Sequence, residues 1–245
     1  MGLNISPRSY KLCSFNCVYC QYGRTTLCTV DASDSLSDFP TPDDFRKALE
    51  SALYEHKGMD YITFSGNGEP TIHPQFDELV DIAKELKEKY SPEAKLAVLS
   101  NSSTVNLEKA RRALAKLDVR IMKLDAGDLE TFVRVNRPCE GVDYWSILNG
   151  LKSLGEVTLQ TMFVDGIIRN IGDQEVRQWI ERVGEIQPLK VQIYSLHRLP
   201  AEPFLRQVPV EKLSKIAVQT EKATGVLVEV ISGHPPYRKK TSRRI

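Results

Sequence analysis

The sequence lacks the features that mark a membrane-spanning, secreted or strongly basic protein. None of its apolar runs approaches the roughly 20 residues that a bilayer-crossing helix needs, and it has no charged-then-apolar secretory leader. Its 33 Lys and Arg residues nearly balance its 32 Asp and Glu residues, so net charge gives no steering towards nucleic acid or a membrane. We therefore expect a cytoplasmic protein with no membrane partner.

Cysteine is scarce, and its distribution is uneven. Three of the five cysteines, Cys13, Cys17 and Cys20, lie within eight residues in the spacing C-x3-C-x2-C. Thiolates this close on one loop can converge on one soft metal centre. Free thiols in such a pattern also indicate a reducing compartment.

The number of nearby thiols limits the kind of centre. Structural zinc sites and four-cysteine clusters use four protein ligands, and no further cysteine has the expected spacing. Three thiolates can instead hold a [4Fe–4S] cluster and leave one iron open for a small molecule. A zinc knuckle completed by Cys28 or a histidine is the alternative, whereas a disulfide would leave an odd third thiol.

Strands and helices alternate along the chain, which predicts βαβ units and a parallel sheet. Strands are expected at 9–12, 61–65, 95–99, 119–124, 157–164, 191–196 and 226–231. Six strand–helix units are fewer than the eight of a closed barrel, so we predict an α/β fold of the partial (β/α)6 TIM-like kind. A doubly wound open sheet is the alternative. We expect one domain over 1–245, with a core of about 8–231 and a basic tail at 232–245.

The helices between these strands are predicted from apolar side chains spaced three to four apart. The best-marked start is Thr41 with Pro42 in the first turn, a pair suited to the N-cap and first helical positions. The helix that ends before Gly155 is expected to bury Trp145 and Leu148.

Ligands of parallel α/β folds bind beyond the carboxyl ends of the strands, so the polar residues there deserve most weight. The cysteine loop follows the first predicted strand, and Gly66-Asn67-Gly68-Glu69-Pro70 follows the second. The glycines allow close backbone approach to a ligand, and the Glu69 carboxylate can accept a hydrogen bond from an ammonium group.

These two motifs, with Tyr19 just before the third cysteine, resemble those of the radical S-adenosylmethionine (SAM) superfamily. The resemblance implies a radical-SAM barrel with two cofactors, a [4Fe–4S] cluster on Cys13, Cys17 and Cys20 and SAM beside it. The second motif resembles the one that holds the amino group of SAM, and Tyr19 is expected beside the adenine. Further SAM contacts are expected at the ends of the following strands, from Ser100, Asn101, Asp125 and Gln160.

Four longer segments resemble the stand-alone Fe–S oxidoreductase branch, which is distantly similar to the wybutosine-synthesis enzymes that act on tRNA. These segments are residues 13–26, 61–70, 136–138 and 197–202. The branch brings no assigned substrate. From the remaining strand ends and loops we expect substrate contacts from Arg24, Asn136, Arg137, His197 and Arg198.

The resemblance implies reductive cleavage of SAM to a 5′-deoxyadenosyl radical, which abstracts a hydrogen atom from a substrate. The implied partners are a one-electron donor, such as a flavodoxin or a ferredoxin-like protein, and a substrate that we expect to be a nucleotide or RNA. A glycyl-radical activase and a peptide or cofactor maturase are alternatives within this class. The alternative from another class is a non-catalytic metal-binding module.

Overall fold

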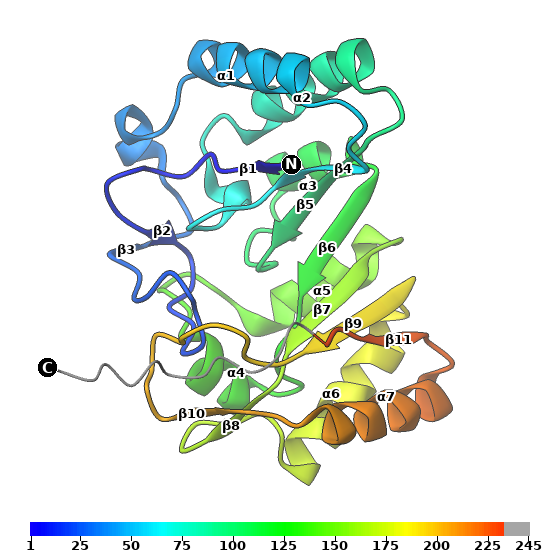
Figure 1. The fold of residues 1–245 in the computed structure, drawn as a ribbon. Helices are drawn as coiled ribbons and strands as arrows, with labels where there is room; N and C mark the ends of the chain where they lie inside the picture. The colour runs from blue at the N-terminus through cyan, green and yellow to red at the C-terminus, as the bar shows by residue number, and fades with distance from the viewer. Residues whose placement is uncertain (233–245) are drawn as a thin grey trace, which may run out of the picture.

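The structure, a computed structural model, describes residues 1–232 and is built on one seven-stranded sheet (Figure 1). Every pair of neighbouring strands in this sheet is parallel. In order across the sheet the strands are β1 (Gly2–Leu3), β4 (Tyr61–Phe64), β5 (Lys95–Ser100), β6 (Val119–Lys123), β7 (Thr158–Met162), β9 (Lys190–Tyr194) and β11 (Val228–Val230). Within the described residues the two edge strands do not pair with each other, so the predicted partial barrel is confirmed and a closed one is not formed.

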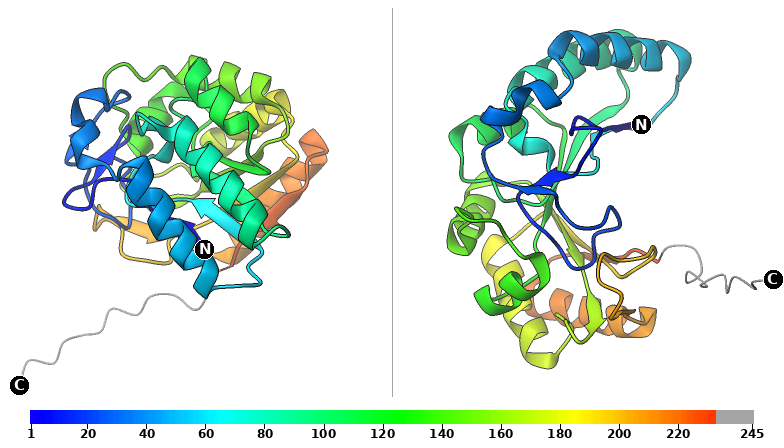
Figure 2. Two further views of the ribbon diagram at one scale, coloured as in Figure 1. Left: turned by 90° about the horizontal axis from the view of Figure 1, so that it is seen from above. Right: turned by 90° about the vertical axis from the view of Figure 1, so that its left-hand side faces the viewer.

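The helices lie around the outside of the curved sheet (Figure 2). They are α1 (Pro42–Glu55), α2 (Phe76–Tyr90), α3 (Glu108–Ala115), α4 (Leu129–Asn136), α5 (Tyr144–Leu154), α6 (Asp173–Ile186) and α7 (Val210–Thr224), with short 3-10 helices at Ser33–Asp38 and Pro70–Ile72. One large apolar core runs from Leu3 to Val228 between the sheet and these helices. None of the helices in residues 1–232 has the length and apolar composition that crossing a membrane requires.

Two features predicted for the helices have different outcomes. The start of α1 is confirmed, because Pro42 is its first residue and the Thr41 hydroxyl accepts a hydrogen bond from the Asp44 amide. The prediction that the helix ending before Gly155, here α5, buries Trp145 is wrong, because Trp145 is 51% exposed. Tyr144 is buried in its place and donates a hydrogen bond to the Ala126 carbonyl, which fixes the rotation of the helix.

The first predicted strand, at 9–12, forms only as Leu12–Cys13 and lies outside the main sheet. The edge of the main sheet is β1 at Gly2–Leu3, whereas β2 (Leu12–Cys13) pairs with β3 (Leu27–Cys28) in a separate two-stranded ribbon. The strand predicted over 157–164 ends at Met162, and the chain then forms β8 (Val164–Gly166), which pairs with β10 (Leu205–Gln207). These strands are two or three residues long, too short to show a period of two in the sequence.

The predicted tail at 232–245 lies outside the described residues, apart from Ser232.

Candidate active site

A cavity of about 510 Å³ opens at the carboxyl ends of β4, β5, β6, β7 and β9, where parallel folds bind ligands. Most of the residues selected from the sequence line it: Cys13, Cys17, Tyr19, Cys20, Gly66, Asn67, Gly68, Glu69, Ser100, Asn101, Gln160, His197 and Arg198. The cavity lining does not include Arg24, Pro70, Asp125, Asn136 or Arg137. Segments far apart in the sequence therefore meet around one space, as the prediction from strand ends requires.

The cysteine loop is seated on the end of α4. The last carbonyl groups of a helix have no partner within it. Here the Val18 amide donates to the Val135 carbonyl at 3.0 Å, and the Asn16 amide donates to the Asn136 carbonyl at 3.1 Å. The side chain of Val18 is fully buried at this contact. The carbonyl groups at the end of α4 thus gain hydrogen-bond donors from the loop, and these hydrogen bonds hold the middle of the cysteine motif in place.

Each thiol of the motif accepts a hydrogen bond from a nitrogen of another segment. Asn101 Nδ2 lies 3.6 Å from the Cys13 sulfur, and Asn136 Nδ2 lies 3.5 Å from the Cys17 sulfur. Lys11 Nζ lies 3.0 Å from the Cys20 sulfur. Donors of this kind favour the thiolate form, which is the form that binds metal.

The environment of the thiols fits an iron–sulfur core. Burial, followed by the negative charge of Cys17, raises the pKa of Cys13. Burial and the charge of Asp125 raise the pKa of Cys17 to about 11. A positively charged iron–sulfur core between the sulfurs would lower both pKa values again, because it favours the thiolate form. Three partly buried thiols on one cavity, each with its own donor, therefore fit the group that the motif implies.

A single metal ion fits less well. Within residues 1–232, no three His, Cys, Asp or Glu side chains are gathered as a bound metal ion requires. Cys28, a candidate fourth ligand of a zinc knuckle, is exposed and is not among the residues that line the cavity. Burial and the neighbouring Cys139 raise the pKa of Cys28 to about 12. These two cysteines therefore lie beside each other, and although Cys28 pairs with Cys13 across β2 and β3, neither is among the residues that line the cavity.

The two glycines of the second motif make close contacts within the protein. A Cβ added at Gly66 would overlap the Asn4 side chain, and one added at Gly68 would overlap the Leu12 carbonyl oxygen. The absence of a side chain therefore lets this loop pack against the segment that leads into Cys13. The glycines thus allow this close packing and also line the cavity.

Gly68→Ala is expected to destabilise the fold by about 1–3 kcal/mol, since the added methyl group would displace backbone. A matched control is Gly184→Ala within α6, where the new Cβ would lie 3.5 Å from the Thr224 methyl group, an ordinary contact. This control is expected to stabilise by about 0.5–1 kcal/mol, the gain of alanine over glycine in a helix. Urea unfolding measures both, and a Gly68→Ala protein as stable as the control would contradict this packing.

Glu69 is buried, with 3% of its surface exposed, and is surrounded by donors. Its Oε1 accepts from the amide and hydroxyl of Thr71 and from the Ser100 hydroxyl, and its Oε2 accepts from the Asn101 amide at 2.6 Å. Burial raises the pKa of Glu69, and these donors oppose the rise. Oε2, with a single donor, keeps acceptor capacity for a further N–H group.

Asn67 provides a second acceptor in the same loop. Its Nδ2 donates to the carbonyls of Pro7 and Tyr10, at 3.2 and 3.4 Å. Its Oδ1 is buried and has no donor among the described residues. An unsatisfied buried acceptor is costly, so a ligand that donates hydrogen bonds, such as an ammonium group, would be favoured here.

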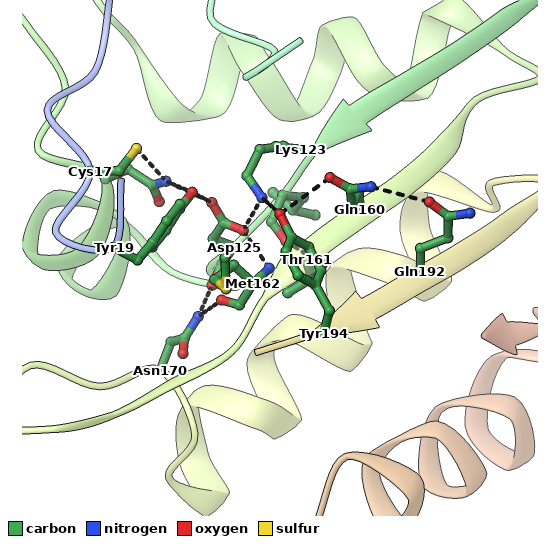
Figure 3. Close-up of polar contacts among 12 residues, drawn as sticks. Cys17, Tyr19, Lys123, Asp125, Gln160, Thr161, Met162, Asn170, Gln192 and Tyr194 are labelled. Atoms are coloured by element: carbon green, nitrogen blue, oxygen red, sulfur yellow. Dashed lines mark hydrogen bonds and ion pairs between the residues drawn. The ribbon is translucent and has the colours of Figure 1, made fainter. Parts of the chain in front are cut away.

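Asp125, for which a SAM contact was expected, is not among the residues that line the cavity. It is buried, and four protein donors occupy its carboxylate: Tyr19 Oη, Asn136 Nδ2 (2.8 Å), the Met162 amide (2.9 Å) and Lys123 Nζ (3.1 Å) (Figure 3). It therefore joins the cysteine loop, α4, β6 and β7 from beneath the cavity. The Tyr19 hydroxyl is used in this contact, while its ring lines the cavity.

Lys123 was missed from the sequence. It lines the cavity from the end of β6 and lies between the rings of Tyr19 and Tyr194, with its Nζ 5.2 Å from each ring centre. Burial lowers the pKa of Lys123, but the nearby charge of Asp125 outweighs it and raises the pKa overall. Lys123 and Asp125 are two residues apart at the end of one strand, and this spacing was the available signal.

Gln160 belongs to a chain of polar contacts along the inner face of the sheet (Figure 3). Its Oε1 accepts from the Tyr194 hydroxyl at 3.3 Å, and its Nε2 donates to Gln192 Oε1 at 3.2 Å. Alternation along β7 and β9 puts these side chains on the inner face, opposite the buried core side. The wall of the cavity is therefore polar on this side.

The five expected substrate residues separate into two groups. His197 and Arg198 follow β9 and line the cavity. Arg24 and Arg137 instead pair with the buried carboxylate of Glu202, at 3.7 and 2.5 Å. Asn136 lies beneath the cavity, where it contacts Cys17 and Asp125.

The fold is shared with solved structures of low sequence identity. SuiB from Streptococcus suis, in its complex with S-adenosylmethionine, superposes with a TM-score of 0.68 over 96% of this chain and 51% of SuiB, at 14% identity. TYW1 with a lysine–pyruvate adduct bound gives a TM-score of 0.61 over 90% of this chain and 73% of TYW1, at 19% identity.

Sequence comparison gives closer relatives. A protein named GTPase Obg from Brachyspira hyodysenteriae is 27% identical over 95% of this chain, which spans only 33% of that protein. A UPF0026 protein from Synechocystis is 31% identical over 78% of this chain and 69% of its own length. The family model of the radical SAM superfamily matches residues 8–183. On this match, and with both motifs meeting at one cavity, the chain belongs to the radical SAM superfamily.

Proposed function

We propose that this chain is an enzyme that cleaves SAM reductively and uses the resulting radical to abstract a hydrogen atom from an anionic substrate. Members of the radical SAM superfamily use a [4Fe–4S] cluster and SAM. The observation that carries the proposal is one cavity lined by three thiols with their own N–H donors and by the Gly66–Glu69 loop.

We assign separate roles in binding the cluster and SAM to the residues of the two motifs. Cys13, Cys17 and Cys20 would hold the cluster, and Asn67 Oδ1 with Glu69 Oε2 would accept hydrogen bonds from the amino group of SAM. When bound, the reduced cluster supplies the electron that splits the SAM sulfonium into methionine and a 5′-deoxyadenosyl radical. The protein contributes position, charge and exclusion of water around that chemistry.

Ser100 and Asn101 act through these groups. The Ser100 hydroxyl donates to Glu69 at 2.8 Å, and Asn101 contacts Glu69 through its amide and Cys13 through its side chain. We therefore assign them to positioning the second motif and the cysteine loop. Gln160 and the ring of Tyr19, which line the cavity, stay available to the nucleoside part of SAM.

Charge on the cavity supports an anionic substrate. Lys11, Lys123 and Arg198 line it beside one carboxylate, that of Glu69, and the Asp125 carboxylate that pairs with Lys123 is not among the lining residues. Cations beside a cavity bind phosphate or carboxylate groups. We propose a nucleotide or an RNA as the substrate, and a flavodoxin or ferredoxin-like protein as the electron donor.

Anaerobic reconstitution with iron and sulfide, followed by EPR spectroscopy of the reduced protein, tests the proposed site. The expected result is the signal of a reduced [4Fe–4S] cluster whose shape changes when SAM is added. Zinc in place of iron, or a cluster signal that SAM leaves unchanged, would favour the non-catalytic metal-binding module instead.

The substrate site is tested with a matched pair of arginine variants. Nucleotides or total RNA should stimulate 5′-deoxyadenosine formation by the wild type. Arg198→Ala should raise the concentration needed for half-maximal stimulation by about 10-fold or more, the loss expected when a charged hydrogen bond is removed. Arg24→Ala, which removes an exposed arginine not among those that line the cavity, should leave it within about twofold. Equal effects of the two changes would remove the basis for a substrate role of Arg198.

A further inference from the structure

Lys11 is a buried lysine without a carboxylate partner. It is 7% exposed and lines the cavity. Its ammonium nitrogen lies 3.0 Å from the Cys20 sulfur and 2.9 Å from the Gly23 carbonyl oxygen. Among residues 1–232 no Asp or Glu forms an ion pair with it, whereas Lys123 pairs with Asp125 at 3.1 Å.

A buried ammonium group is costly unless a negative charge lies nearby. The Cys20 sulfur, which accepts a hydrogen bond from Lys11 Nζ, can carry such a charge in its thiolate form. The placement of Lys11 is therefore explained when Cys20 is a metal-bound thiolate. A neutral, hydrogen-bonding residue would have served if the sulfur stayed a thiol.

Lys11 is also joined to the cysteine loop through its backbone. Its carbonyl oxygen accepts from the amides of Thr26 and Leu27, at 3.0 and 3.2 Å. Through its side chain the same residue contacts Cys20 and Gly23 within the loop. Through its backbone and its side chain, Lys11 thus contacts the middle and the end of the loop that carries the three cysteines. These contacts fix the position of its charge relative to the cysteines.

We propose that the Lys11 ammonium group sets the reduction potential of the cluster through its contact with Cys20. The inference rests on the proposed function, since it needs the cluster on Cys13, Cys17 and Cys20. Reduction adds one negative charge to the cluster. A fixed positive charge 3.0 Å from a ligand sulfur stabilises that state, because hydrogen bonds to sulfur and local charge tune such potentials. Lys11 is therefore a positioning residue that makes the cluster easier to reduce by the external donor.

The test measures the midpoint potential of the reconstituted cluster, without SAM, by EPR-monitored redox titration. Lys11→Met keeps a stem of similar length and removes the charge, and Lys11→Arg keeps the charge. At the potential where wild type is half reduced, the ratio of reduced to oxidised cluster should fall at least tenfold in Lys11→Met. This fall corresponds to a midpoint about 59 mV more negative for a one-electron couple. Lys11→Arg should stay close to wild type.

The possible results distinguish a failure of the proposed function from a failure of the inference about Lys11. A wild-type protein that forms no [4Fe–4S] cluster would contradict the proposed function. A Lys11→Met protein with full iron content and an unchanged potential would overturn the inference and leave Lys11 as a structural anchor only.

A second measurement on the wild type covers the case in which Lys11→Met fails to load iron. Protein labelled with 15N only at lysine should show a 15N coupling to the reduced cluster in ENDOR spectra, and Lys11→Arg should lack it. Absence of that coupling in the wild type would overturn the inference without any variant.

Discussion

Asp125→Ala is expected to destabilise the fold by about 3–5 kcal/mol, even in the absence of iron and SAM. The substitution removes the partner of buried Lys123 and leaves that ammonium group without a counter-charge. It also leaves Tyr19, Asn136 and the Met162 amide without their acceptor. For a chain of this length the midpoint of thermal unfolding should fall by about 10 °C.

A second aspartate supplies the control. Asp165 on β8 pairs with Arg206, which is 72% exposed, at 3.2 Å. A surface pair of this kind contributes about 0–1 kcal/mol, so Asp165→Ala should change stability little. Urea unfolding of both cluster-free variants measures the difference. If Asp125→Ala were no less stable than Asp165→Ala, Asp125 would be a ligand-binding residue, as first expected from the sequence, rather than a structural one.

The predicted residues that line the cavity were selected from local sequence pattern together with one rule about the fold. Cysteine spacing and the Gly66–Pro70 sequence mark two loops, and the rule that ligands bind at carboxyl ends of parallel strands puts those loops together. His197 and Arg198 were found by the same rule, since they directly follow β9. Strand-end position is thus a good guide to which residues face the cavity.

Strand-end position does not predict which hydrogen-bond or ion-pair partners a polar residue has in the folded protein. Asp125 was expected to contact SAM, but donors from segments at 19, 123, 136 and 162 occupy its oxygens. Arg24 and Arg137 were expected at the substrate and instead pair with Glu202. Apart from the Lys123–Asp125 pair, these contacts join residues at least 11 positions apart, and no local pattern in the sequence records them.

Short elements were missed for a related reason. Both β1 and β3 have two residues, so alternation cannot identify them. Helix α4 has eight residues and was not predicted, although Asp128 caps its start by accepting from the Thr131 amide. The end of α4 supports the cysteine loop, so missing it also hid the role of Asn136.

Loss of one cluster ligand should have the largest effect on activity. Cys17 is the thiol that contacts Asn136 and lies closest to the Asp125 network, and its sulfur cannot be replaced by a methyl group as a ligand. We expect Cys17→Ala to abolish formation of 5′-deoxyadenosine. Cys28→Ala is the matched control, because Cys28 is exposed and is not part of the cavity lining, and it should retain activity within about twofold.

The most direct measurement of the central claim is therefore 5′-deoxyadenosine formation by the reconstituted protein with SAM and a strong reductant, followed by mass spectrometry. The account predicts the nucleoside from wild type and Cys28→Ala and none from Cys17→Ala. Undiminished formation by Cys17→Ala would contradict the assignment of this cavity as the site of SAM cleavage.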